Sequence, residues 1–542
     1  MKWIAHLKKD DTALYIAAFV LLIPALFIGL GYMPLMSDEG IRALVALEMD
    51  FDGHYFTPTI NGHYYFNKPP LYNWMVLGFF KLFDSHSLYV FRLPNLLMGL
   101  LFGGVIYQFG RYFFSAKKAA LAALLFLTCG RVLFNDFHLG LMALTHGMVL
   151  FLNFWVLFHF YRKQNWVALF TLSYLLIAVT FLMKGLQGVA AQAITLPVFF
   201  LWKKDFKRLF HWQHFFGFFV FVGTIAVYMG IYHQLNPDVF NQYIATLWDQ
   251  SEQRTFLEYG WIDNVVHLFT YPFKVVYAIL PYGFIVFLLF KKAWWARVKK
   301  HEFLAFAALM FAANNLVYLA SPFWHARYIF FLLPLLFYLL LDAWENPELT
   351  SKKVSNFLNQ LWLGLAIVAA LGAIVFPFTP LADGIEHTFL VTALLLIAFG
   401  VLIYSMIQIP QSRLILFVLV LIVARYGSDF LYMKAYSHQI KEYQHRQLAI
   451  EAAQFSAGTP LHLYQAPYLS EDVSYYIARE RGETLKREFK YVNAEDYYAI
   501  DSKQRKKLDR QGRNYTVLFN FETRSRYHTM HMVQFDESFT IE

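Results

Sequence analysis

Two short motifs in one stretch of the chain carry side chains that could perform a group transfer. Met36–Gly40 (MSDEG) places the neighbouring carboxylates Asp38 and Glu39 at the start of a helical pattern. Phe66–Leu71 (FNKPPL) places the ammonium group of Lys68 directly before two prolines. A carboxylate can take a proton from an attacking group, whereas an ammonium group can bind an anion. We therefore predict that the loop holding both motifs is the reaction centre.

The position of Lys68 favours a phosphate ligand. Pro69 and Pro70 predict a helix start, because a proline lacks the N–H that would be unpaired in a first turn. The segment 71–83 is apolar but too short to cross a bilayer, so we expect it to lie at the membrane surface. Lys68 would then stand at a helix N-terminus, where backbone N–H groups also favour an anion. In the alternative interpretation, Lys68 only extends its ammonium group toward lipid headgroups.

The aspartate of the first motif also has two interpretations. Asp38 can act as a general base. It can also cap the N-terminus of a helix that the pattern predicts from Glu39 to Phe51, which is a common use of aspartate. The two roles are compatible with each other.

The composition is that of an integral membrane protein. Of the 542 residues, 58% are hydrophobic and 20% are aromatic, while only 15% are charged. The chain is therefore far more apolar than an ordinary globular domain. The first hydrophobic stretch, 14–32, has no clear small-residue cleavage site, and we expect it to be retained. The single cysteine, Cys129, lies in an apolar run, which excludes an intrachain disulfide and predicts a packing role.

Thirteen hydrophobic runs are long enough to be membrane spans. Placing the N-terminus in the cytoplasm puts the lysine and arginine pairs of nearly every alternate connection on that side. The odd count then exports the loop 33–87, the loop 234–271 and everything after residue 431. We expect a multi-pass membrane protein whose reaction centre faces outward, away from the cytoplasm. The predicted spans are 14–32, 88–109, 117–134, 139–160, 165–183, 186–202, 213–233, 272–290, 302–320, 326–342, 357–377, 388–407 and 412–431.

The few cations predicted near the outer face are candidates for the same site. Charges that break the positive-inside bias close to a membrane are costly, and they tend to serve a function. Lys184 lies between two hydrophobic runs, Arg254 lies in the loop 234–271, and Arg327 lies where the tenth span begins. Together they suit a lipid phosphate or pyrophosphate, and salt bridges within the bundle are the alternative for each one singly. Asp136 is a second outward acid, which could partner Asp38 or pair with Arg131.

The change in character near residue 431 predicts two domains, 1–431 in the membrane and 432–542 outside it. The tail holds 16 Lys and Arg against 15 Asp and Glu, so it is nearly neutral and cannot be a polybasic lipid-binding segment. Helical patterns at 439–454 and 471–480 alternate with strand patterns at 461–465 and 515–520. This predicts a small soluble α/β domain on the outer side of the membrane. No catalytic triad, phosphate loop or zinc motif is recognisable in the tail sequence.

Several passages in one order resemble the bacterial membrane glycosyltransferases of the protein-mannosyltransferase superfamily, which includes the aminoarabinose transferases that modify lipid A. The resemblance covers roughly residues 14–340, and the ordered set is more specific than any one passage. The passages are Ser37–Glu39 (SDE), Tyr65–Leu71 (YFNKPPL), Phe91–Leu96 (FRLPNL), Gly110-Arg111, Arg131 with Asp136, Thr180–Gly185 (TFLMKG), and Arg327-Tyr328 with Pro334.

This resemblance implies a fold and a set of roles. The expected fold is of the GT-C type, an α-helical polytopic membrane protein with a small C-terminal domain. The expected reaction transfers a sugar from a polyprenyl-phosphate donor on the outer face, with inversion at the sugar carbon. Asp38 would be the catalytic base, with Asp136 and Glu39 as further acids of the catalytic set. The donor phosphate would be held by Lys68, Arg254, Lys184, Arg327, Tyr65 and Tyr328.

The acceptor and any cofactor stay open at this point. Relatives of the aminoarabinose type often have a glutamate before the lysine of the KPP motif, whereas this chain has Asn67, so no cofactor is certain and a divalent metal remains an option. The leading acceptors are lipid A, lipopolysaccharide or another envelope glycan. The alternatives are a protein O-glycosyltransferase and a lipid or sugar transporter, although we find no internal repeat that would favour transport. We expect membrane lipids, a lipid-linked sugar and a lipid or glycan acceptor as partners, and no nucleic acid.

Overall fold

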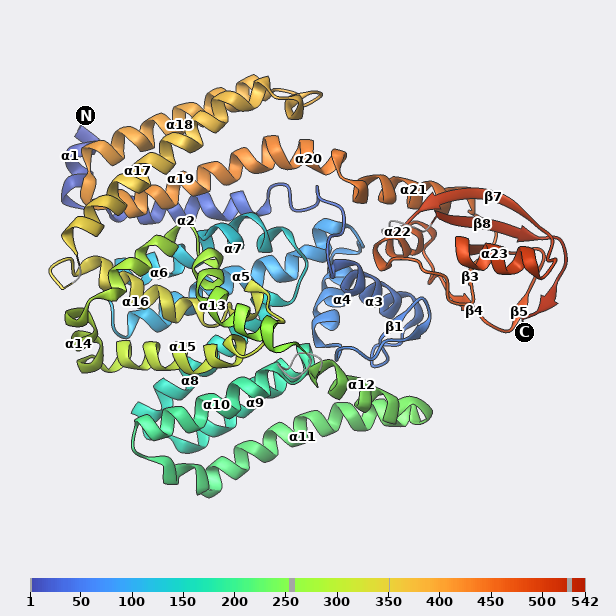
Figure 1. Ribbon diagram of the computed structural model, residues 1–542, viewed down its shortest axis with the longest axis horizontal. Helices are drawn as coiled ribbons and strands as arrows, with labels where there is room; N and C mark the ends of the chain where they lie inside the picture. The colour runs from blue at the N-terminus through green and yellow to red at the C-terminus, as the bar shows by residue number, and fades with distance from the viewer. Residues whose placement is uncertain (1, 253–258, 350, 524–528, 542) are drawn as a thin grey trace.

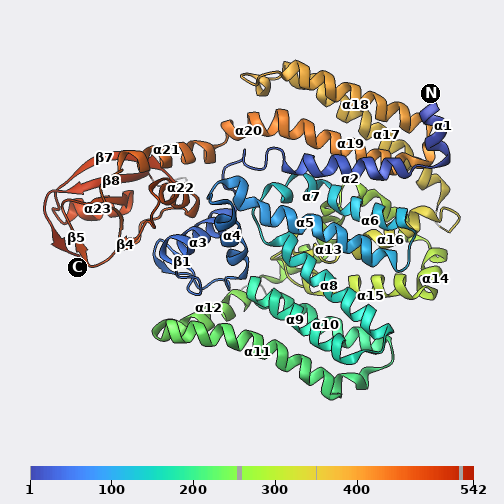
Figure 2. The same cartoon turned by 180° about the vertical axis from the view of Figure 1, so that it is seen from behind.

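The protein is a helical bundle with a small sheet domain at one end (Figure 1). The computed structural model describes residues 2–252, 259–349, 351–523 and 529–541. The N-terminal helix α1 (Lys2–Lys9) and the C-terminal domain lie at opposite ends of the long axis, and the view from behind agrees (Figure 2). The fold therefore has one end that holds α1 and another that holds the sheet domain.

Eight helical runs of the described chain are long and apolar enough to cross a membrane, by length and composition, and a bent pair makes up to nine. The bent pair joins α6 (Ala116–Thr128) to α7 (Gly130–Phe134) and η1 (Asp136–His138) at 51°. The last of the eight joins α19 (Arg413–Gly427) to α20 (Met433–Gln439). The others are α5 (Leu88–Arg111), α8 (Ala143–Arg162), α9 (Trp166–Lys184), α11 (Trp212–Leu235), α15 (Glu302–Leu319), α17 (Lys352–Val375) and α18 (Thr388–Gln408).

The other predicted spans correspond to shorter or interrupted helices. The predicted span 272–290 is divided between α13 (Trp261–Ala278) and the 3-10 helix η5 (Tyr282–Phe290). The predicted span 326–342 begins as the 3-10 helix η6 (Ala326–Ile329) and continues as α16 (Leu333–Glu345). A polytopic helical membrane protein is confirmed, while the number of thirteen spans stays a prediction. The remaining short spans are α2 (Thr12–Phe27) and α10 (Gln187–Trp202).

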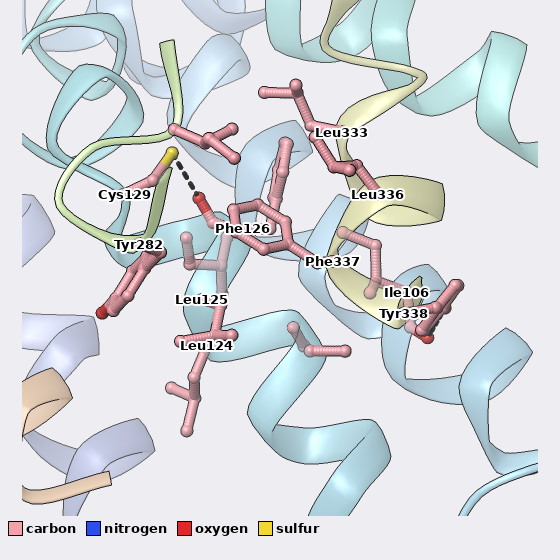
Figure 3. Packing of buried hydrophobic residues seen from close by; sticks show 14 of the residues in the cluster. Ile106, Leu124, Leu125, Phe126, Cys129, Tyr282, Leu333, Leu336, Phe337 and Tyr338 are labelled. Carbon is pink, nitrogen blue, oxygen red and sulfur yellow. Dashed lines mark hydrogen bonds between the residues drawn. The ribbon is translucent and has the colours of Figure 1, made fainter. Parts of the chain in front are cut away.

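The core of the bundle is built from aliphatic and aromatic side chains around the short helix α7. Cys129 is a fully buried free thiol among them, and its Sγ donates to the carbonyl of Phe126 at 3.3 Å (Figure 3). A glycine allows α5 and α6 to approach closely, because a Cβ on Gly103 of α5 would lie 2.6 Å from the Leu127 side chain of α6. Small residues at such contacts let membrane helices pack without a hydrophobic driving force between them.

The loop between α2 and α5 folds into a compact platform at the sheet-domain end of the bundle (Figure 1). It contains α3 (Glu39–Asp52), a two-stranded hairpin of β1 (Thr59–Ile60) and β2 (His63–Tyr64), and α4 (Leu71–Phe83). The helix predicted after the two prolines is confirmed with the same bounds, because Pro70 is the residue before its first turn. Within the described residues, the Asp38 side chain makes no capping hydrogen bond, and Glu39 accepts one from the Met36 N–H instead, at 2.8 Å.

The C-terminal domain has a mixed five-stranded sheet in the order β4-β3-β6-β8-β7. Strands β3 (Leu461–Tyr464), β4 (Arg487–Glu488) and β6 (Tyr497–Asp501) are parallel, whereas β8 (Thr529–Phe535) runs antiparallel to β6 and β7 (Tyr515–Glu522). The predicted elements are present as α21 (Lys441–Phe455), β3, α22 (Glu471–Arg481) and β7. The patterns did not indicate β6, β8 or α23 (Ser502–Arg510). The helical run from the membrane continues past residue 431 to Gln439.

This domain packs directly on the platform. The N–H of Leu35 donates to the Tyr476 hydroxyl of α22 at 2.8 Å, and both groups are buried. Gly40 of α3 lies against the backbone of Asp472, since a Cβ added there would stand 2.7 Å from the Asp472 N. One hydrophobic cluster includes side chains of α3, α4, α21, α22 and the sheet. The start of α3, where Asp38 lies, is therefore held from outside by the C-terminal domain.

Candidate active site

Both sequence motifs face one cavity of about 340 Å³. Asp38 and Arg42 reach it from the start of α3, and Lys68 reaches it from the turn before α4. The far wall comes from the end of α9 and from η6, which contribute Lys184 and Arg327. Residues that are distant in the chain, and that the sequence predicted to act together, therefore line the same space.

Asp38 forms an ion pair with Arg327 across this cavity. The Arg327 guanidinium lies 3.0 Å from Asp38 Oδ2, and the aspartate side chain is still 45% exposed. Burial acts to raise the pKa of Asp38, but the positive charges of Arg327, Lys68 and Arg42 outweigh it, so the pKa lies below its ordinary value. Asp38 is accordingly ionised at neutral pH and accessible from the cavity.

Lys68 and Lys184 approach the cavity from opposite walls. Lys68 is half-buried and lies three residues before Leu71, the first residue of α4. Lys184 is the last residue of α9, and its ammonium group lies 4.4 Å from the ring centroid of Tyr328, which also lines the cavity. Arg42, Arg327 and these two lysines line the same cavity as Asp38, which is the single carboxylate among the described lining residues. Such an excess of positive charge suits an anionic ligand such as a phosphate.

Tyr65 is held in place by Arg42, which is not among the site residues predicted from the sequence. Arg42 is fully buried, and its guanidinium donates to the Tyr65 hydroxyl and, at 3.4 Å, to the Asn73 side-chain carbonyl. Burial raises the pKa of Tyr65, so the hydroxyl stays protonated and can donate to a ligand in the cavity. Contacts of this kind are set by tertiary packing of α3 on α4 and have no local sequence signal.

The two other predicted acids lie outside the group that lines the cavity in the described structure. Glu39 is buried, pairs with Arg92 at 2.9 Å and accepts from the Gly140 N–H at 2.6 Å. Asp136 is also buried and pairs with Arg131 at 2.8 Å, which is the second partner that the sequence left open. Both acids therefore contact the elements that surround Asp38.

Two further side chains line the cavity without having been singled out from the sequence. His325 precedes η6, and its pKa is lowered by burial and by the charge of Arg327, so the ring is neutral at neutral pH. Gln250 reaches the cavity from α12 (Phe240–Glu252), in the predicted outer loop. Arg254, predicted as a phosphate ligand, lies outside the described residues, four positions after Gln250.

A second cavity, of about 350 Å³, continues from the first. The two share Lys184, Tyr328 and Phe323. The second cavity runs between α10 and α15, and its walls are mainly apolar, with Ala190, Ala191, Val317 and Phe331 among them. A mainly apolar space that adjoins a cation-lined cavity and shares Lys184 with it suits a lipid with an anionic head.

The residues that the structure describes include no group of three His, Cys, Asp or Glu side chains placed to hold a metal ion. Asn67, the residue before Lys68, lines the first cavity. An amide oxygen is a weaker ligand than a carboxylate for a divalent cation.

Comparison with known proteins places this geometry in context. Residues 67–232 match the sequence family described as dolichyl-phosphate-mannose-protein mannosyltransferase. An uncharacterized protein of Aquifex aeolicus is 25% identical over 384 residues, which are 67% of this chain and 72% of that protein. An undecaprenyl phosphate-alpha-4-amino-4-deoxy-L-arabinose arabinosyl transferase of Pseudomonas savastanoi pv. phaseolicola is 28% identical over 256 residues, which are 44% of each chain.

The fold is that of a solved protein. The crystal structure of ArnT from Cupriavidus metallidurans bound to undecaprenyl phosphate superposes with a TM-score of 0.64 at 18% identity, over 96% of this chain and 97% of that one. The apo structure of the same protein gives the same TM-score over 96% and 98%. The resemblance found in the sequence is thereby confirmed: the chain is similar to the aminoarabinose transferases, and it is a polytopic membrane protein with the GT-C fold that ArnT has.

Proposed function

We propose that the protein is an inverting glycosyltransferase that moves a monosaccharide from a polyprenyl-phosphate donor to lipid A, lipopolysaccharide or another envelope glycan. The observation that carries this proposal is the pairing of the two cavities. One holds an ionised carboxylate together with several cations, and the other is a mainly apolar cavity that shares Lys184 with the first. A lipid-linked sugar phosphate has the matching sequence of apolar, anionic and reactive parts.

The donor phosphate would bind where the cavities meet. Lys184 lines both, so it is suited to hold the phosphate with the isoprenoid chain in the apolar cavity. Lys68 and Arg327 would bind the same phosphate from the other walls, with the hydroxyl groups of Tyr65 and Tyr328 as neutral donors. Arg254 remains a proposed fifth ligand that follows α12 in the chain.

The transfer itself would be a single displacement at the anomeric carbon. The acceptor oxygen forms a bond to that carbon as the bond to the phosphate oxygen breaks, and the released electron pair stays on the polyprenyl phosphate. Asp38 takes the proton of the acceptor O–H. Lys68, Lys184 and Arg327 stabilise the charge that develops on the leaving phosphate, usually the largest contribution in a site of this kind.

Asp136 and Glu39 would act as positioning residues through their ion pairs, without lining the cavity themselves. Glu39 follows Asp38 in the chain, and its ion pair with Arg92 fixes the first turn of α3. Arg92 also donates to the carbonyls of Leu30, Met33 and Pro34 at 2.9 Å, so one guanidinium orders the whole approach to Asp38. Asp136 would act through its ion pair with Arg131, which lies outside the residues that line the cavity.

The reaction centre is proposed to face the periplasm across the bacterial inner membrane. The basic helices α1 and α14 (Lys292–Lys300) lie at the end of the bundle opposite the platform (Figure 1). Positively charged connections favour the cytoplasm, so this end would be cytoplasmic and the platform with the sheet domain periplasmic.

A second candidate is protein O-glycosylation, because the matching sequence family is described as a protein mannosyltransferase. One experiment separates the two. Membranes containing the protein are incubated with extracted polyprenyl-phosphate sugars, and lipids and polypeptides are analysed by mass spectrometry. A sugar adduct on lipid A or another glycan, absent with Asp38→Asn, supports the first proposal. An adduct found only on polypeptides supports the second, and no adduct on either rejects both.

A further inference from the structure

A third cavity, of about 290 Å³, lies far from the reaction centre, between the last turns of α5 and α8. Helix α8 connects the two places, because Ala143 at its start lines the first cavity and Arg162 at its end lines the third. Twenty helical residues rise about 30 Å, the thickness of the hydrocarbon core of a bilayer. The third cavity therefore opens at the opposite membrane surface, and its function is independent of the proposed transfer.

The rim of this cavity carries positive charge that the protein does not neutralise. Arg162 and Lys163 both line it and are exposed, and among the described residues no carboxylate lies within ion-pairing distance of either. Several other cations of this end are paired: Lys117 with Asp10 and Asp11, Lys118 with Asp342 and Glu345, and Lys203 with Glu302. The two charges at the cavity are thus available to an external anion.

The wall of the cavity is aromatic. The Arg162 guanidinium carbon lies 5.9 Å from the centroid of the Phe158 ring, a distance typical of a cation–π contact. The Tyr112 hydroxyl and His159 Nδ1 lie 2.8 Å apart, which fixes the histidine ring at the edge. Trp155 also lines the cavity, and its indole N–H has no hydrogen-bond partner among the described residues. The cavity therefore offers an apolar floor, hydrogen-bond donors and two cations.

We propose that this cavity binds the headgroup of an anionic phospholipid. The cavity lies at the ends of two membrane helices, where the phosphate groups of the lipids are expected. Tyrosine and tryptophan are favoured at this membrane–water interface. The phosphate would contact Arg162 and Lys163, and the first carbons of the acyl chains would lie against Trp155 and Phe158. Basic pockets between membrane helices on the cytoplasmic side recognise anionic lipids by this combination of charge and shape. Free phosphate would satisfy the charges but not the aromatic wall.

The test compares two double variants of the full-length protein that remove equal charge from the same end of the bundle. Arg162→Gln with Lys163→Gln removes both positive charges from the rim of the third cavity. Lys299→Gln with Lys300→Gln removes two charges from the end of α14, at residues that line none of the three cavities. Each protein is purified in detergent and titrated with phosphatidylglycerol or phosphatidylcholine, and bound lipid is counted by native mass spectrometry. Inorganic phosphate is added as a competitor in a parallel series.

The wild-type protein and the α14 variant should retain phosphatidylglycerol in preference to phosphatidylcholine. The rim variant should bind it about 10- to 30-fold more weakly, as two lost basic contacts predict. Equal weakening in both variants would overturn the proposal in favour of unspecific surface charge. Unchanged binding in the rim variant would overturn it outright. Displacement of the lipid by inorganic phosphate at similar concentration would assign the site to free phosphate instead. Thermal unfolding of each variant shows whether it is folded, and Lys163→Gln alone gives a milder charge loss in the same direction.

Discussion

Replacing Asp38 with asparagine should remove the base while leaving the cavity intact. Asparagine has the same shape, and its side-chain carbonyl can still accept from Arg327, whose nitrogen lies 3.0 Å from Asp38 Oδ2. Within the described residues the Asp38 side chain does not cap α3, so the helix start does not depend on the carboxylate. We therefore expect a stable, normally inserted protein.

The size of the effect follows from what the carboxylate does. General-base catalysis is typically worth about 10²–10⁴-fold, so transfer should slow by at least about 100-fold. Donor binding should be unchanged or stronger, because the substitution removes the one negative charge from a group that includes Arg42, Lys68 and Arg327. The loss should then appear in kcat, with the KM for the donor equal or lower.

The assay is initial-rate kinetics on purified protein with a varied polyprenyl-phosphate sugar and a fixed acceptor. A pH series adds an independent measure. The pKa of Asp38 lies below its ordinary value, and the base works only when ionised. Wild-type kcat/KM should therefore persist as the pH falls to about 4 and be lost only below that. Glu39→Gln should have a milder effect, since Glu39 faces Arg92 and not the cavity.

Three outcomes would refute this reasoning. Normal transfer by Asp38→Asn together with an inactive Asp136→Asn would reassign the base to Asp136. Normal transfer by both would mean that this loop is not the reaction centre. An acid limb between about pH 4 and about pH 6.5 in the wild type would point to a histidine with a lowered pKa, with His325 as the candidate in the cavity.

The other predictions test the donor site, the orientation and the tail. Lys68→Ala should lose donor binding and activity together and Lys68→Arg should restore part of both, because the two cations differ in shape and hydration; normal donor affinity in Lys68→Ala would support headgroup contact alone. A reporter enzyme active only in the periplasm should work when fused after Glu542, and activity of a cytoplasmic reporter there would reverse the orientation. Asp472→Ala should leave turnover within a few-fold of normal, and a thousandfold loss in a folded protein would contradict that. Gly40→Ala should reduce kcat by tenfold or more, because the added Cβ would stand 2.7 Å from the Asp472 N and displace α22 or the start of α3; unchanged kinetics would show that the contact yields freely.

Local signals carried the sequence analysis a long way. The prolines before Leu71 gave the start of α4, and hydrophobic run lengths placed most of the membrane helices. The patterns at 461–465 and 515–520 marked two strands of the sheet. Each of these follows from a propensity or period that a few neighbouring residues express on their own. Strands β6 and β8 were missed because they are buried in the sheet, where mixed apolar runs do not alternate clearly.

Residues of the candidate site could be predicted where a charged residue interrupts a hydrophobic stretch of the sequence. They could not be predicted where their position depends on tertiary packing. Lys184 and Arg327 could be identified from the sequence because a cation close to the membrane is costly and usually serves a function. Arg42 and Tyr65 gave no such signal as a pair, since their contact arises only when α3 lies against the hairpin and α4. The same is true of Glu39, which the sequence grouped with Asp38 but which turns inward to Arg92. Adjacent residues at a helix start point in different directions, so sequence neighbourhood alone does not make them partners.

The contact between Leu35 and Tyr476 shows what a domain boundary drawn from composition leaves out. These residues are 441 positions apart, yet the Tyr476 hydroxyl accepts the Leu35 N–H at 2.8 Å, three residues before Asp38. The backbone of Asp472 closes on Gly40 from the same helix, two residues after Asp38. The proposed base is therefore bracketed by the C-terminal domain on both sides. Acidic side chains of that domain can be expendable for catalysis while the position of α22 is not, because the helix acts through backbone contact and one hydroxyl.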